Sequence, residues 1–197
     1  MADRYQKFKE LNRYESEFRV YVEDRASDVT IIAPHGGRIE PNTSEIAAFI
    51  AGDRYNLFCF NGLKENDNHH LHLTSHKFDH PQALSLVRRS SYVVAVHGCT
   101  VSKPVVYLGG LDEELIRQIS SELENHRIDN EYGHHRYRGT HRNNICNRGR
   151  FGRGVQLELS RGLRDSGSAH IKIGVAVKSA ISTLEKKSGE VRELPLP

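Results

Sequence analysis

The chain contains no tryptophan, a single methionine and only three cysteines among its 197 residues. Cys59, Cys99 and Cys146 are odd in number and far apart, which argues against a disulfide framework and favours synthesis in a reducing cytosol. No apolar run approaches the ~18 residues that a membrane span requires, so we expect no membrane partner. The opening MADRYQKFKELNRY lacks an apolar core segment, which predicts the absence of a secretory signal peptide.

The composition is that of an ordinary globular protein. Apolar residues make up 37% and charged residues 27% of the chain, a balance far from that of disordered segments. Because 197 residues is the usual size of one domain, residues 1–197 are expected to form a single domain with its own core. The pattern leaves the oligomeric state open, and we expect a monomer.

Strand patterns alternate with helical patterns along the chain. The segments expected as strands are FRVYVEDR, DVTIIAPH, RYNLFCFNG, HHLHLTS, SYVVAVHG, PVVYLGG and GVQLELS. The segments expected as helices are residues 3–14, NTSEIAAFIAG, HPQALSLVRRS, LDEELIRQISSELENH and SAHIKIGVAVKSAISTLEKK. This order predicts an α/β fold in which helices flank a mixed, mostly parallel sheet.

Polar side chains occur at or near the ends of three expected strands. His35 follows DVTIIAP, His97 follows SYVVAV, and Glu158 lies within GVQLELS. Because ligands of open α/β sheets collect at the carboxyl ends of the strands, we expect these side chains at one edge. A catalytic zinc ion typically takes three ligands from histidine and carboxylate and keeps a fourth position for water. His35, Glu40 from the same loop and the distant His97 predict such a site.

The loop between His35 and Glu40 suits a metal site. Gly36 and Gly37 lack Cβ atoms, so they permit a sharp turn and a close approach of the backbone to a ligand. Glu45 is a competing carboxylate, but it falls in the first turn of an expected helix, where the helix dipole favours an acid. Taken singly, each histidine could equally be a structural residue that forms hydrogen bonds at the edge of the core. Two strands that end in His-Gly, together with a nearby glutamate, favour a metal site over that structural interpretation.

Glu158 is the candidate general base of this site. Leu157 and Leu159 flank it, and burial of a carboxylate raises its pKa toward neutrality, as a general base requires. The alternative is a structural ion pair with a neighbouring arginine. His72 is a candidate contact for the substrate. Cys99 directly follows His-Gly and is expected to be a small packed residue near the site.

Arginine is concentrated in one part of the chain, although the net charge is only +3. Eight arginines occur at positions 136, 138, 142, 148, 150, 153, 161 and 164. This segment indicates either a polyanionic partner or a solvated basic surface. Because no established nucleic-acid-binding motif is present, we expect no nucleic acid partner.

Four segments resemble the poly-γ-glutamate hydrolase family, whose members occur in bacteriophages of bacilli and in related bacterial proteins. They are APHGGRIEPNTSEIA, LHLTSHKFDHP, VAVHG and NRGRFGRGVQLELSRGLR. The resemblance implies a fold related to zinc carboxypeptidases, with one Zn²⁺ held by His35, Glu40 and His97 and with Glu158 as general base. It also implies cleavage of γ-glutamyl amide bonds in poly-γ-glutamate, and release of the enzyme by host lysis if the source is a phage.

Poly-γ-glutamate carries a free α-carboxylate on every unit, and guanidinium groups bind carboxylates in bidentate fashion. The candidates for stabilising the oxyanion are Arg148, Arg150 and Arg153. Arg161 and Arg164 are candidates for holding flanking carboxylates, and ion pairs with acids such as Asp165 are the alternative.

Two other functions use parts of the same pattern. A zinc-dependent amidase for small N-acyl amino acids would use the same metal ligands and base but would close its cleft around one carboxylate. A non-enzymatic module would bind a polyanion through the arginines, with a steep dependence on salt and none on chelators.

Overall fold

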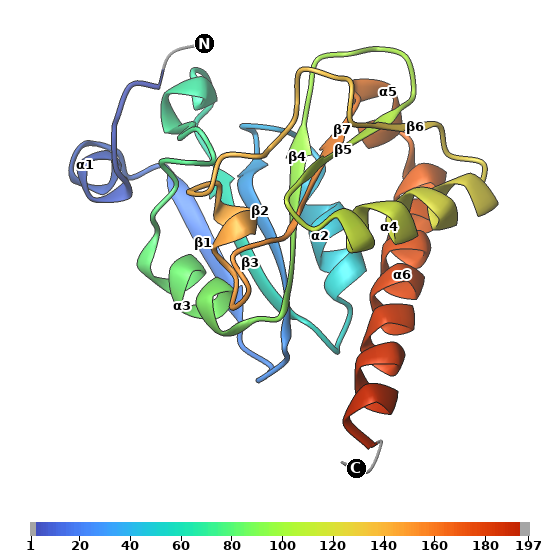
Figure 1. Cartoon of the computed structure of the whole chain (residues 1–197). Coiled ribbons are helices and arrows are strands. Elements are labelled where there is room, and N and C mark those ends of the chain that lie inside the picture. The colour runs from blue at the N-terminus through green and yellow to red at the C-terminus, as the bar shows by residue number, and fades with distance from the viewer. Residues whose placement is uncertain (1–2, 194–197) are drawn as a thin grey trace.

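The computed structural model describes residues 3–193 (Figure 1). In this range the strands are β1 (Phe18–Glu23), β2 (Val29–Gly37), β3 (Asn56–Gly62), β4 (Tyr92–Gly98), β5 (Val106–Gly110), β6 (Asn130–Tyr132) and β7 (Val155–Leu159). The α-helices are α1 (Phe8–Tyr14), α2 (Thr43–Ala51), α3 (Pro81–Arg89), α4 (Glu113–Asn125), α5 (Arg161–Arg164) and α6 (Gly167–Glu193). Two short 3₁₀ helices are η1 (Asn68–Leu71) and η2 (Ile145–Arg148).

The described strands form one sheet whose middle is parallel and whose outer strands are not. The order is β1-β3-β2-β4-β7-β5-β6. The neighbours β3, β2, β4 and β7 run parallel, whereas β1 pairs antiparallel with β3, and β5 pairs antiparallel with β7. The predicted α/β fold with a mixed, mostly parallel sheet is confirmed. The carboxyl ends of β2, β4 and β7 therefore meet at one edge.

Helices cover both faces of the sheet, and alternate residues of a strand enter different cores. Helices α1 and α3 lie on one face and α2, α4 and α6 on the other (Figure 1). In β2, Ile31 and Ala33 pack in the core that includes α2, α4 and α6, whereas Ile32 packs in the core that includes α1 and α3. A strand buried on both faces reads as a continuous apolar run, as this one does. None of the helices in the described range has the combination of length and apolarity that a transmembrane segment requires.

The strand predicted in HHLHLTS is wrong, because residues Asn68–Leu71 form the 3₁₀ helix η1. The alternating pattern has another origin. Leu71 and Leu73 are fully buried in the core beside α3, whereas His72 between them lines a cavity at the edge of the sheet. Alternation of burial without strand pairing therefore produced a strand-like sequence.

The helix predicted over residues 3–14 begins only at Phe8. The segment before it is bent and irregular, and it is held to a neighbouring loop because the Asp3 carboxylate accepts hydrogen bonds from the Thr74 backbone N–H at 3.0 Å and from the Thr74 hydroxyl at 2.9 Å. Long-range hydrogen bonds thus replace the first turn that the apolar spacing predicted.

A single buried guanidinium connects the segments that follow β2, β4 and β7. Arg164 donates from Nη1 to the carbonyl of Pro41 at 2.6 Å and from Nη2 to the carbonyl of Cys99 at 3.0 Å. Its Nε donates to the carbonyl of Leu159 at 3.2 Å. A Cβ on Gly98 would lie 2.5 Å from that Nε, so the strand end can approach the guanidinium this closely only as glycine. These contacts tie together the three strand ends that carry the predicted site.

Candidate active site

Donor atoms of three side chains converge at the carboxyl edge of the sheet. The Nδ1 atom of His35 lies 3.2 Å from Oε1 of Glu40 and 3.1 Å from Nδ1 of His97. Oε2 of Glu40 lies 3.7 Å from the same His97 nitrogen. Ligands placed 2.0–2.1 Å from a tetrahedral zinc ion are roughly 3.3–3.4 Å apart. The chemistry and spacing of this donor set therefore fit a zinc ion.

The backbone around His35 explains how the two donors from this loop reach one place. The pairing of β2 with β3 shifts register between Ala33 and Gly36, and such a bulge redirects the side chains beside it. The Glu40 N–H donates to the His35 carbonyl at 2.8 Å, which closes the turn. Gly37 adopts a φ of +62°, in the left-handed region that favours glycine. The Gly98 N–H then donates to the Glu40 carboxylate at 2.8 Å and fixes it beside β4.

The outer nitrogens of both histidines are engaged away from the cluster. Nε2 of His35 lies 2.7 Å from the carbonyl of Leu73, an acceptor, so this nitrogen carries the proton. Nε2 of His97 lies 3.3 Å from the hydroxyl of Ser75. In neutral imidazoles held this way Nδ1 can offer its lone pair to a metal, which is the usual arrangement around zinc-binding histidines.

Burial and mutual attraction shift the pKa values in this cluster in opposite directions. Burial would raise the pKa of Glu40, but the charge on His35 and its hydrogen bond outweigh burial and lower this pKa to about 2. Burial also opposes a charge on His35, yet Glu40 raises its pKa. Burial lowers the pKa of His97 to about 3, so this ring is neutral at pH 7. A dication requires the carboxylate and neutral imidazoles, so a metal ion would displace the proton that Glu40 favours on His35.

Glu158 lies beside the cluster on the neighbouring strand. It pairs with His97 in the register of β4 and β7, and its Oε1 accepts a hydrogen bond from Nε2 of Gln156 at 3.0 Å. Burial and the negative charge of Glu40 raise its pKa to about 8, while Arg164 and Arg136 partly offset them. A carboxylate poised near neutrality can accept and release a proton during a reaction.

His72 is a further donor close to the cluster. Its ring centroid lies 4.0 Å from that of His35, and one ligand atom from each of His35, Glu40 and His72 lies within 4.8 Å of the others. Asp3 accepts a hydrogen bond from its Nδ1 at 3.1 Å. The charge of His35 and then burial lower the pKa of His72 to about 4. His72 is therefore a neutral donor whose Asp3 partner fixes its orientation.

A cavity of about 400 Å³ opens over these groups, and we call it the active cavity. His35, Glu40, His72, His97 and Glu158 all line it. Its other side is formed by residues 136–141, an irregular segment between β6 and η2. The exposed side chains at its rim are His76, Arg136, Arg138, Thr140 and His141.

The structure places the three predicted oxyanion arginines away from this cavity. Arg148 donates to the carbonyl of Phe78 at 3.3 Å. Arg150 pairs with Asp28 at 3.4 Å, and Arg153 pairs with Asp112 at 3.5 Å. These last two arginines precede β7 and therefore lie near the amino ends of the parallel strands, whereas Glu158 lies toward the carboxyl end of β7. This placement revises the sequence-based choice of arginines.

The two arginines predicted to hold flanking carboxylates are also engaged elsewhere. Arg161 is exposed and pairs with Asp165 at 3.4 Å, which is the alternative that the sequence left open. Arg164 is buried and gives its guanidinium to three backbone carbonyls, so it supports the site instead of facing the cavity. Cys99 is buried as predicted.

Arg136 and Arg138 are the arginines that line the active cavity. Both belong to the arginine-rich segment of the sequence, but the predicted oxyanion arginines were other members of that segment. Residues 136–141 contain no helix or strand, so no periodic pattern could have shown that they fold over the sheet edge. Only the sequence GHHRYRGTH, rich in histidine and arginine, was a signal for them.

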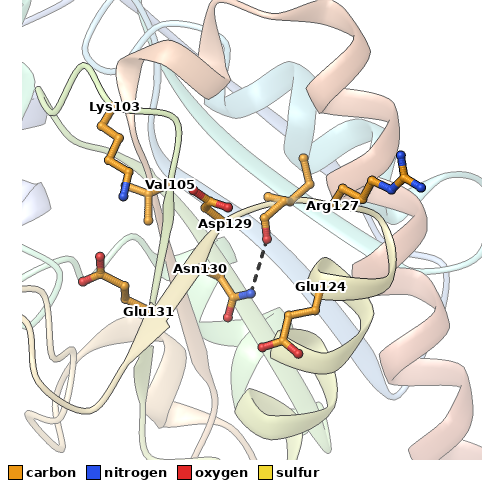
Figure 2. A pocket seen from close by; sticks show the side chains of 8 residues that line it. Lys103, Val105, Glu124, Arg127, Asp129, Asn130 and Glu131 are labelled. Carbon is orange, nitrogen blue, oxygen red and sulfur yellow. Dashed lines mark hydrogen bonds between the residues drawn. The ribbon is translucent and has the colours of Figure 1, made fainter.

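Another hollow of about 420 Å³ lies beside β6 and the end of α4, and Figure 2 shows its side chains. Its charged residues have both signs: Lys103, Glu124, Arg127, Asp129 and Glu131. It contains none of the predicted site residues, and its mixed charges give no sign of a particular ligand.

Comparisons with known proteins agree with this geometry. The family model described as poly-gamma-glutamate hydrolase matches residues 5–183. The SPbeta prophage-derived UPF0714 protein YoqZ of Bacillus subtilis (strain 168) is 37% identical over 163 residues. That match covers 81% of this chain but only 59% of YoqZ, so the chain spans less than two thirds of this relative's length.

Two solved structures share the fold over most of their length. A bacteriophage poly-gamma-glutamate hydrolase superposes with a TM-score of 0.90 at 27% identity, covering 94% of this chain and 99% of that one. The zinc-free apo form of YndL superposes with a TM-score of 0.86 at 28% identity, covering 92% and 98%. The resemblance carried by the sequence segments is confirmed, and the chain belongs to the poly-γ-glutamate hydrolase family.

Proposed function

We propose that this protein is a zinc-dependent hydrolase that cleaves the γ-glutamyl amide bonds of poly-γ-glutamate. The observation that carries the proposal is the convergence of His35, Glu40 and His97 at spacings of 3.1–3.7 Å beside a carboxylate whose pKa is raised to about 8. Family membership and a bacteriophage poly-gamma-glutamate hydrolase of the same fold supply the substrate class.

His35, Glu40 and His97 are the proposed zinc ligands, and His72 is the alternative to His97 as the third ligand. When bound, zinc would polarise the scissile carbonyl and lower the pKa of a water molecule. The protein's part is to hold the donor atoms in place. The carbonyl of Leu73 orients His35, and the backbone N–H of Gly98 orients Glu40.

Glu158 is the proposed general base and acid. Its carboxylate accepts a proton from the attacking water and passes it to the amine that leaves as the amide bond breaks. The hydrogen bond from Gln156 occupies Oε1, so Oε2 is the oxygen proposed to take the proton. The place of Glu158 on β7, between β4 and β5, leaves this side chain half-buried, and this partial loss of water together with the charge of Glu40 keeps the carboxylate basic.

Arg136 is the proposed stabiliser of negative charge on the scissile carbonyl oxygen. It lines the active cavity and is near enough to Glu158 to lower the pKa of that group. Its Nη2 donates to the Tyr137 hydroxyl at 2.5 Å, which orients the guanidinium. A cation placed where charge develops stabilises the transition state more than the substrate.

The first prediction concerns the reaction itself. Incubation with poly-γ-glutamate should shorten the polymer, a chelator should abolish the shortening, and added Zn²⁺ should restore it. Size-exclusion chromatography of the products is the measurement, and α-linked polyglutamate, which should stay intact, is the control. Unchanged γ-polymer with zinc present would contradict the proposal, and cleavage of N-acyl glutamate instead would favour the small-substrate amidase.

The second prediction concerns the ligands. His35→Ala and His97→Ala should each lower zinc affinity by at least about 100-fold, because each removes one of three protein donors. Equilibrium dialysis followed by metal analysis measures this, and His69→Ala, which removes an exposed histidine outside the cluster, is the matched control. Stoichiometric zinc in both site variants would refute the ligand assignment. Retention in His97→Ala but loss in His72→Ala would move the third ligand to His72.

The third prediction concerns Glu158. Glu158→Gln keeps the shape and the hydrogen bond from Gln156 but cannot accept a proton, so kcat should fall by about 10²–10⁴-fold while zinc stays bound. Steady-state kinetics with metal analysis of the same sample separates the two effects. Turnover near the wild-type value would exclude Glu158 as the base.

The raised pKa of Glu158 also gives a pH dependence with a defined sign. Its folded-state pKa of about 8 exceeds the ordinary value of 4.5, so the folded protein binds more protons between these values. The stability that Glu158 contributes is therefore fully present below pH 4.5 and lost as pH rises through 8. Without zinc, the wild type should lose stability relative to Glu158→Gln from pH 5.5 to 8, with a slope approaching about 1.4 kcal/mol per pH unit. Urea unfolding with chelator measures the difference, and parallel stability curves would contradict it.

A further inference from the structure

A second cavity lies on the other side of the segment that covers the active site. It has a volume of about 470 Å³, within the range of roughly 300–1,000 Å³ that ligand pockets occupy. Its walls come from β5, from the first turns of α4 and from residues 132–135, which begin with the last residue of β6. We call it the flanking cavity.

The flanking cavity and the active cavity lie on opposite sides of one segment of the chain. Arg138 and Thr140 line both cavities. The segment between them lies directly on β5, because the Gly110 N–H donates to the Arg138 carbonyl at 2.8 Å. A Cβ on Gly109 would lie 2.4 Å from that carbonyl oxygen, so glycine permits the close approach. The two cavities are therefore separated by one irregular segment of chain that is hydrogen-bonded to the sheet.

Arg138, in the segment between the two cavities, has a guanidinium that can bind a ligand carboxylate. In the flanking cavity, Arg117 pairs with Glu113 at 3.3 Å. Arg138 is exposed and forms no ion pair with any residue in the described part of the chain. An arginine at this position can bind a carboxylate through two parallel hydrogen bonds.

The dimensions match a γ-linked polymer. The two cavities meet at Arg138 and Thr140, which line both of them. A γ-glutamyl unit has five backbone atoms where an α-peptide unit has three, so it extends roughly 6 Å when an α-peptide unit extends about 3.5 Å. A γ-linked chain that continues from the active cavity past Arg138 and Thr140 thus brings its following units to the flanking cavity.

We propose that the flanking cavity is a subsite for a glutamyl unit next to the scissile bond, with the α-carboxylate of that unit bound by Arg138. This inference rests on the proposed function of the active cavity. It gives the protein a preference for long γ-linked chains over short ones, because a chain that crosses the boundary gains contacts that a short substrate does not make.

Oligomers of γ-linked glutamate with two to twelve units, of defined length, test the subsite. For the wild type with zinc, kcat/KM should rise with length and level off once the flanking cavity is filled. Arg138→Gln removes the guanidinium, and His134→Glu places a negative charge in the wall of the flanking cavity alone. In both variants the rise with length should be about tenfold smaller, the effect typical of one lost charge-assisted hydrogen bond.

Matched controls carry the same chemical changes outside the two cavities. Arg142→Gln and His69→Glu alter exposed residues that line neither cavity and should keep the wild-type dependence on length. Wild-type length dependence in both cavity variants, or no length dependence in the wild type, would overturn the subsite. If the wild type cleaves no oligomer and no polymer, the proposed function itself fails.

Discussion

The buried guanidinium of Arg164 is the contact on which the arrangement of the site depends. Arg164 is buried away from solvent, and its three nitrogens donate hydrogen bonds to the carbonyls of Pro41, Cys99 and Leu159. These carbonyls follow Glu40, His97 and Glu158 by one or two residues, on segments far apart in the sequence. A buried charge left without its hydrogen bonds costs several kcal/mol, so the fold favours the arrangement in which all three segments meet.

Within that frame, the electrostatics separate two carboxylates into two roles. Glu40 lies against His35 and the Gly98 N–H and stays ionised, as a metal ligand must. Glu158 is half-buried on β7, close to the charge of Glu40, and its pKa rises to about 8. The same cluster therefore contains one strong anion and one carboxylate able to exchange a proton near neutrality, which is the combination that the proposed hydrolysis requires.

The sequence predicted the parts of the site that belong to strands and failed for the part that belongs to a loop. His35, His97 and Glu158 end or interrupt apolar runs, so their place at the sheet edge followed from strand topology. Arg136 and Arg138 lie in a segment without periodicity, and its fold over the edge depends on long-range contacts such as the one with Gly110. The same limit applies to the three-residue strand β6 and the four-residue helix α5, which are too short to leave a pattern.

The most direct test of this account is the zinc affinity and turnover of Arg164→Lys. Lysine keeps the charge but replaces a planar fork with one ammonium group, which cannot meet three diverging carbonyls. The account predicts a folded protein whose turnover of poly-γ-glutamate falls at least about tenfold and whose zinc binding weakens, while Arg161→Lys, at the exposed arginine three residues earlier, leaves both unchanged. Wild-type zinc affinity and turnover in Arg164→Lys would contradict the claim that this guanidinium assembles the site.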